Sequence, residues 1–131
     1  MFMPATHRID PDEKDVFVEV TGVLTFDDLL SDRNRMRNDP AFDPSFNFLM
    51  DLRSVTRFYI TGDELRALAV DSALDRAAKQ VYVVPSDIVY GMARIYSAVS
   101  KADPDAVQVF RNMNSARAWL GLGAEEEQGG N

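Results

Sequence analysis

Apolar runs of two kinds alternate along the chain. Short runs rich in β-branched and aromatic residues predict strands, and longer segments with apolar residues at every third or fourth position predict helices. The predicted strands cover residues 6–10, 15–22, 46–52, 80–84 and 106–110. Of the predicted helices, the first opens at Thr25, the second covers about 62–72, the third covers about 87–100, and the last runs from an N-cap at Asn114 to Gly121.

This order of elements predicts an α/β fold with a single mixed, mostly parallel five-stranded sheet and four helices. The segment 11–14 is a turn candidate, so the first two strands are expected to form an antiparallel hairpin. We expect one domain over residues 1–123. The acidic and glycine-containing tail 124–131 has no apolar anchor and is expected to be disordered.

Two helices carry informative apolar spacing. The third predicted helix has the clearest helical period in the chain, formed by Ile88, Met92, Ile95, Tyr96 and Val99. In the first predicted helix the apolar stripe is broken by a charged residue, Arg33.

Charge and composition exclude several function classes. The net charge is −7, which disfavours nucleic acid and an anionic membrane surface as partners. No apolar run is long enough for an integral membrane protein, and the first residues lack a signal-peptide pattern, so we expect a cytoplasmic protein. With no cysteine and a single histidine, His7, we expect no metal site, no cofactor and no catalytic residues.

Several short motifs resemble the STAS-like superfamily, and the small bacterial SpoIIAA-like proteins in particular. The run LMDLRSVT at 49–56 is similar to the strand followed by D-L-x-x-V that these proteins share. Further similarity lies in VPSD at 84–87, in YGMARIY at 90–96, and in the ending formed by Val107, Val109, Phe110, Ala116, Trp119 and Leu120. The resemblance spans about residues 6–122 and implies a regulatory module that binds a protein partner.

The same resemblance implies a phosphorylation site. In the anti-sigma-factor antagonists of this superfamily, a serine in an Asp-Ser-Ser-Gly loop before the second helix is phosphorylated and switches partner binding. Here Thr61 and Gly62 keep the hydroxyl and the glycine of that loop, whereas Tyr59 and Ile60 replace its other residues. We therefore expect a degenerate loop with Thr61 as a candidate phospho-acceptor. Glu64 follows Thr61 by three residues, which equally predicts a capping box.

A second hypothesis places an anionic ligand at the rim of the sheet. Thr61 with Gly62, and Ser86, open two helices that each follow a strand, and helix N-termini at this edge of a parallel sheet favour anions. Arg53 and Arg57, on the predicted loop before Thr61, are expected to add positive charge. The alternative is that Thr61 and Ser86 only cap their helices.

Other residues are candidates for a pocket rim or an interface. The apolar segment formed by Phe58, Tyr59 and Ile60 is expected either to fold under the sheet or to form an exposed patch. Tyr90 and Arg94 are neighbours on the third predicted helix and are expected to stack, or to form a rim or a subunit contact. Gly91, between them, suggests the close approach of another backbone, either from this chain or from a second one.

Together these observations predict a non-enzymatic binding or regulatory module that forms a homodimer. The alternative is a carrier or sensor of a small anionic or lipid-like ligand. An enclosed apolar cavity would favour this alternative, whereas a flat, exposed apolar face would favour the interaction module.

Overall fold

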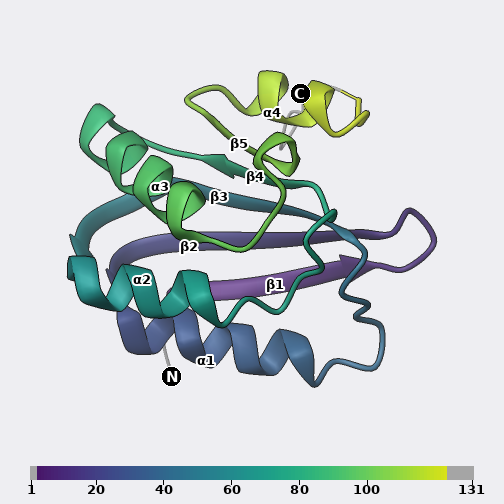
Figure 1. Ribbon diagram of the computed structural model, residues 1–131, viewed down its shortest axis with the longest axis horizontal. Coiled ribbons are helices and arrows are strands. Elements are labelled where there is room, and N and C mark those ends of the chain that lie inside the picture. The colour runs from purple at the N-terminus through teal and green to yellow at the C-terminus, as the bar shows by residue number, and fades with distance from the viewer. Residues whose placement is uncertain (1–2, 124–131) are drawn as a thin grey trace.

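Five strands form one mixed sheet whose spatial order follows the chain order, β1-β2-β3-β4-β5 (Figure 1). The computed structural model describes residues 3–123, so the predicted disordered tail lies outside the described residues. The strands are β1 (Ala5–Asp10), β2 (Asp15–Thr25), β3 (Asn47–Tyr59), β4 (Gln80–Val83) and β5 (Val107–Phe110). The helices are α1 (Phe26–Arg37), α2 (Gly62–Val70), α3 (Asp87–Val99) and α4 (Met113–Trp119), and a 3₁₀ turn covers Pro104–Ala106. The predicted α/β class is therefore confirmed.

The N-terminal hairpin is confirmed. Strands β1 and β2 pair antiparallel from Ala5 opposite Val20 to Asp10 opposite Asp15. In the turn between them the Asp10 carboxylate accepts a hydrogen bond from the Glu13 backbone N–H, and Lys14 takes a left-handed conformation with φ of 61°.

The remaining strand pairs are parallel, and each is joined by a helix. Because right-handed crossovers that advance in one direction return on the same side, α1, α2 and α3 lie together on one face of the sheet (Figure 1). Helix α4 follows the last strand and packs on the other face, against β4 and β5.

The helices thus divide the apolar interior into two clusters. The larger lies between the sheet and α1–α3, and its buried members include Val18, Leu24, Phe48 and Leu65. The smaller lies beneath α4 and consists of Leu49, Val81, Val83, Met113, Ala116 and Leu120. All four residues of β4 are buried, as expected for a strand covered on both faces.

Strand β3 is much longer than predicted. The segment that the sequence analysis assigns to a loop, including Arg53 and Arg57, continues β3 as far as Tyr59. It pairs with the second half of β2, where Gly22 has a φ of 71° and the register shifts twice. Gly22 therefore does not end β2 but lies at an irregularity that lets both strands continue.

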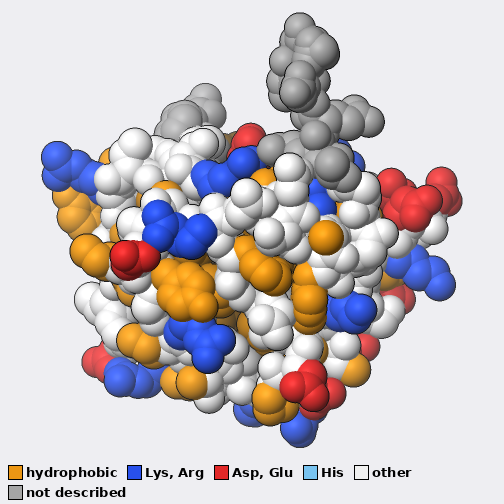
Figure 2. Space-filling model, turned by 90° about the horizontal axis from the view of Figure 1, so that it is seen from above, with side chains coloured by type: hydrophobic (Ala, Val, Ile, Leu, Met, Phe, Trp, Pro, Cys, Tyr) orange, Lys and Arg blue, Asp and Glu red, His pale blue; other side chains and the backbone are white. Residues whose placement is uncertain are grey.

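The helices also differ from the prediction in detail. The N-cap of α4 is Asn112 rather than Asn114, because the Asn112 side chain accepts a hydrogen bond from the Ser115 backbone N–H at 2.9 Å. On α3, Met92 and Tyr96 pack against the larger core. Three other residues of its apolar period are exposed: Ile88 by 78%, Ile95 by 50% and Val99 by 37%. The outer flank of α3 is therefore apolar. On the face of the molecule seen in Figure 2, hydrophobic side chains likewise reach the surface among charged ones.

Within residues 3–123, no helix has both the length and the apolar character needed to cross a bilayer.

Candidate functional site

The residues predicted to bind an anion are engaged in other contacts: Thr61 and Ser86 follow the carboxyl ends of β3 and β4, whereas the two arginines lie within β3. The Arg53 guanidinium meets the Asp51 carboxylate through two hydrogen bonds of 2.9 Å, from Nε and from Nη2. Arg57 donates to the Tyr59 hydroxyl at 3.2 Å. Both arginines lie on β3 rather than on a loop, so the predicted loop position of their charges is wrong.

Thr61 and Ser86 cap helices, as the alternative interpretation predicted. The Thr61 hydroxyl accepts from the Glu64 backbone N–H at 3.1 Å, and the Glu64 carboxylate accepts from the Thr61 N–H at 2.9 Å. Gly62 is the first residue of that helix, α2. The Ser86 hydroxyl accepts from the Val89 N–H at the start of α3. A phosphate on Thr61 would place its negative charge beside the Glu64 carboxylate.

The aromatic segment at the end of β3 does not form one patch. Ile60 is buried, Phe58 is partly buried and packs on the larger core, and Tyr59 is 57% exposed. The segment therefore splits between the two predicted outcomes, with one side chain outside and two turned inward.

Tyr90 and Arg94 are exposed on α3 and do not stack on each other. The cation–π contacts found in residues 3–123 are those of Arg8 with Phe17 and Lys79 with Trp119. A Cβ atom added at Gly91 would meet no described atom within 4 Å. No described part of this chain therefore approaches Gly91 closely, and the approach of a second chain stays a prediction.

The structure instead shows a pocket that the sequence analysis did not predict. A cavity of about 90 Å³ lies between the sheet and helices α1, α2 and α3. Its walls are mostly apolar and come from three strands, three helices and the loop after α2. Representative lining side chains are Leu24, Phe48, Phe58, Leu65, Met92 and Ala93.

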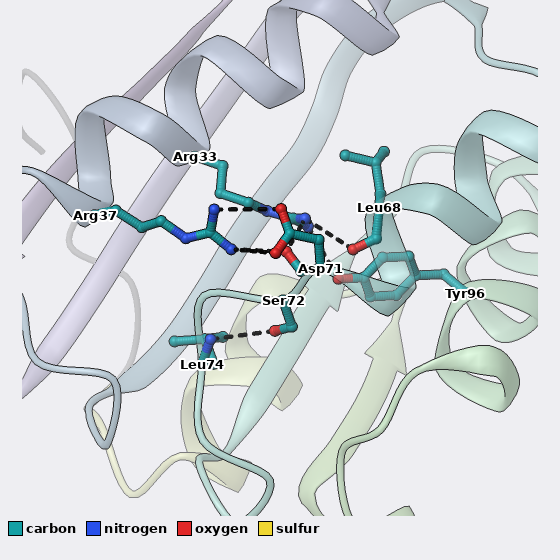
Figure 3. A network of polar contacts seen from close by, with 7 residues as sticks. All are labelled: Arg33, Arg37, Leu68, Asp71, Ser72, Leu74 and Tyr96. Carbon is teal, nitrogen blue, oxygen red and sulfur yellow. Dashed lines mark hydrogen bonds and ion pairs between the residues drawn. The ribbon is translucent and has the colours of Figure 1, made fainter.

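A small group of polar side chains lines one part of this pocket (Figure 3). Arg33 reaches from α1 to the end of α2, where its Nη1 donates to the carbonyl oxygens of Leu68 at 2.8 Å and Asp71 at 2.6 Å. Its Nη2 donates to the Tyr96 hydroxyl at 3.3 Å. Ser72 follows in the loop, and its hydroxyl accepts from the Leu74 N–H. Arg33 thus satisfies carbonyl groups that a helix end leaves open.

Neighbouring carboxylates are held by other cations. The Asp71 carboxylate faces Arg37, at 3.0 Å from Nη2 and 3.3 Å from Nη1, and this hydrogen bonding lowers the Asp71 pKa below its usual value. Asp32, which also lines the pocket, lies 3.2 Å from His7 Nδ1 and 3.3 Å from Arg35 Nη2. In the described chain, no carboxylate lies within 4.0 Å of Arg33.

A neutral phenol forms part of the pocket wall. The Tyr82 hydroxyl donates to the side-chain oxygen of Gln80 at 2.9 Å, and its ring meets the Tyr96 ring edge-on, with 5.7 Å between the ring centres. Burial raises the Tyr82 pKa well above its usual value. Tyr82 therefore stays protonated at physiological pH.

The break in the apolar stripe at Arg33 is a sequence signal of a polar group on the inner side of α1, but by itself it does not predict a pocket. The other lining residues form apolar patterns that are equally typical of a filled core.

Comparison with known proteins adds no assignment, because no protein-family model, curated protein or solved structure matches the chain. The resemblance to SpoIIAA-like proteins stays a prediction.

Proposed function

We propose that this protein is a non-enzymatic binding module that holds a small, mainly apolar molecule in the pocket beneath α1, α2 and α3. The observation that supports this proposal is the cavity of about 90 Å³ inside the larger core. Protein interiors are normally packed as densely as organic crystals. Apolar side chains that line an unfilled pocket lack packing partners on one side, and a bound apolar ligand would supply those contacts.

The test is an NMR titration of methyl-labelled protein with hexan-1-ol, a neutral probe. Binding in the pocket is expected to shift the methyl signals of Leu24, Leu65 and Met92, which line it, and to leave those of α4 unchanged. A saturating concentration of 100 times the Kd is expected to stabilise the protein by about 2.7 kcal/mol.

A matched pair of variants on α3 distinguishes binding in the pocket from binding on the helix surface. Ala93 lines the pocket, whereas Ala98 is exposed on the same helix. Ala93→Leu is expected to fill the pocket and abolish the hexan-1-ol shifts, and Ala98→Leu is expected to preserve them. Equal binding by both variants, or no pocket shifts in the unaltered protein, would contradict the proposal.

A second candidate function is self-association through the outer flank of α3, which would make the protein an interaction module. The observation in its favour is the row of exposed side chains formed by Ile88, Ile95 and Val99. Large exposed apolar groups in a row are typical of protein interfaces. Sedimentation is expected to show a dimer that Ile95→Ser weakens. Val70→Ser serves as the control, because Val70 is similarly exposed at the end of α2.

A further inference from the structure

Arg33 places a positive charge beside an apolar pocket and forms no ion pair within 4.0 Å among residues 3–123, although its charge contributes to the lowered pKa of the Asp71 carboxyl group. Its bonded partners are two backbone carbonyls and one phenol, all neutral groups. The nearest acidic residue along these contacts, Asp71, directs its carboxylate to Arg37 (Figure 3). Arg33 is half-buried, so an anion that reached it would gain a charge-assisted contact at a partly desolvated guanidinium.

Arg33 also has donors to spare. A guanidinium carries five N–H groups. Both hydrogens of Nη1 are used by the Leu68 and Asp71 carbonyls, and Nη2 donates once, to Tyr96. The Nε–H and the second Nη2 hydrogen have no acceptor among residues 3–123. The Ser72 hydroxyl lies in the same wall of the pocket and accepts one hydrogen bond, from Leu74.

The rest of the pocket wall limits the polarity and the size of the part of the ligand that does not contact Arg33. The residues that face the cavity away from this group are mostly apolar, including Leu24, Phe48 and Leu65. Larger engineered cavities, of about 150 Å³, hold a single benzene ring. The pocket, at about 90 Å³, therefore encloses only a few carbon atoms of a ligand, and the rest of a six-carbon chain would extend into its open side.

From this arrangement we infer that the ligand is a short-chain amphiphilic carboxylic acid. Its carboxylate binds Arg33 and the Ser72 hydroxyl, and its alkyl part lies among the apolar side chains of the pocket. One guanidinium matches the single charge of a carboxylate and its paired oxygens. This inference rests on the proposed function and adds the chemical class of the ligand.

The test compares hexanoate with hexan-1-ol, which have the same chain length and differ in the head group, by NMR titration at pH 7. Hexanoate is expected to bind the unaltered protein at least about tenfold more tightly than hexan-1-ol, which is the effect of one charge-assisted hydrogen bond. Arg33→Gln is expected to remove this preference, so that both probes bind alike.

Arg37→Gln is the matched control. Arg37 lies one turn further along α1 and also bonds to Asp71, but it does not line the pocket. The preference for hexanoate is expected to survive in this variant. If Arg37→Gln removes the preference as fully as Arg33→Gln, general surface charge explains the effect and the inference is overturned.

The outcomes separate the inference from the proposed function. Equal binding of hexanoate and hexan-1-ol by the unaltered protein overturns the carboxylate inference and leaves the apolar pocket standing. Absence of pocket shifts with both probes overturns the two together. If circular dichroism shows that Arg33→Gln does not fold, the Arg33 Nε–H resonance of the unaltered protein decides the question. A shift with hexanoate but not with hexan-1-ol supports the inference, and the same response to both overturns it.

Discussion

Tyr82 is buried in the larger cluster, between the sheet and α1–α3, so its ionisation is coupled to folding. Burial raises its pKa in the folded state, whereas the unfolded chain ionises near a pKa of about 10. The stability that depends on the neutral phenol is therefore fully present below about pH 10. It is lost as the pH rises further, with a slope of up to about 1.4 kcal/mol per pH unit.

Tyr82→Phe is expected to remove this alkaline slope. At neutral pH the same variant is expected to cost about 1–3 kcal/mol, because the buried Gln80 oxygen loses its donor. Urea unfolding at several pH values between 8 and 11 measures both effects. Tyr59→Phe, at an exposed tyrosine, is the control and should keep the slope. An unchanged slope in Tyr82→Phe would show that another group governs alkaline unfolding.

The capping box at Thr61 gives a second prediction at this scale. Thr61→Ala removes the hydroxyl that accepts from the Glu64 N–H and is expected to lower the free energy of unfolding by about 1 kcal/mol. Thr61→Ser keeps an acceptor in the same place and is expected to stay within about 0.5 kcal/mol of the unaltered protein. Urea denaturation checks the pair, and equal losses in both variants would mean that the methyl group rather than the cap stabilises this site.

Single residues were predictable where their role depends on near neighbours in sequence. The N-caps at Thr25, Thr61 and Ser86 follow from a hydroxyl placed just before a helix, and the structure confirms all three. The α4 cap was misplaced because Asn112 and Asn114 both suit that role locally. The contacts of Arg33 were not predictable, since its partners lie at least 35 positions away in the chain.

Among the elements, α3 has apolar side chains on two different flanks. Substitutions on these two flanks are expected to lower the free energy of unfolding by different amounts. Val89 faces the core, and Val89→Ala is expected to cost about 2 kcal/mol through lost burial and a small cavity. Ile88 is 78% exposed, so Ile88→Ala is expected to change the stability of the isolated chain by less than about 0.5 kcal/mol.

Thermal unfolding at several protein concentrations measures this difference. If α3 packs against a second copy, the loss caused by Ile88→Ala becomes larger at high concentration, because association stabilises the folded state by mass action. A loss of about 2 kcal/mol at high dilution would contradict the exposed position of Ile88.

Strand β3 shows why element boundaries were harder to predict than element types. Residues 53–59 alternate without a strong apolar face, and Arg53, Arg57 and Tyr59 are exposed. They become a strand because the second half of β2 offers a parallel edge with free backbone groups. That edge exists only after Gly22 lets β2 continue, which local sequence patterns do not reveal.

For the whole molecule, the layered arrangement was predictable and the pocket was not. The alternation of strands and helices, together with the right-handed rule for crossovers, leads to a mostly parallel sheet with its helices in layers. A cavity depends on how well side chains from six elements fill the space between them. Apolar periodicity indicates which side chains face inward, but it does not show whether their volumes match that space.

The two sides of the sheet are expected to differ in local stability. The cluster beneath α4 has six buried members, whereas the cluster beneath α1–α3 has sixteen. Helix α4 is also short, with seven residues. Because local opening requires only the contacts of the opening unit to break, α4 is expected to open at a lower free energy than β3 and β4.

Native-state hydrogen exchange in low denaturant tests this difference. Met113→Ala, at the start of α4, is expected to speed exchange of the α4 amides, such as that of Leu120, and to leave β3 and β4 amides less affected. Leu65→Ala, in the larger cluster, is expected to lower the free energy of global unfolding by about 2–5 kcal/mol. All amides that exchange only through global unfolding should show this same loss. If Met113→Ala speeds exchange of every amide equally, the variant has lowered only the free energy of global unfolding. That result would show that both clusters unfold as one unit.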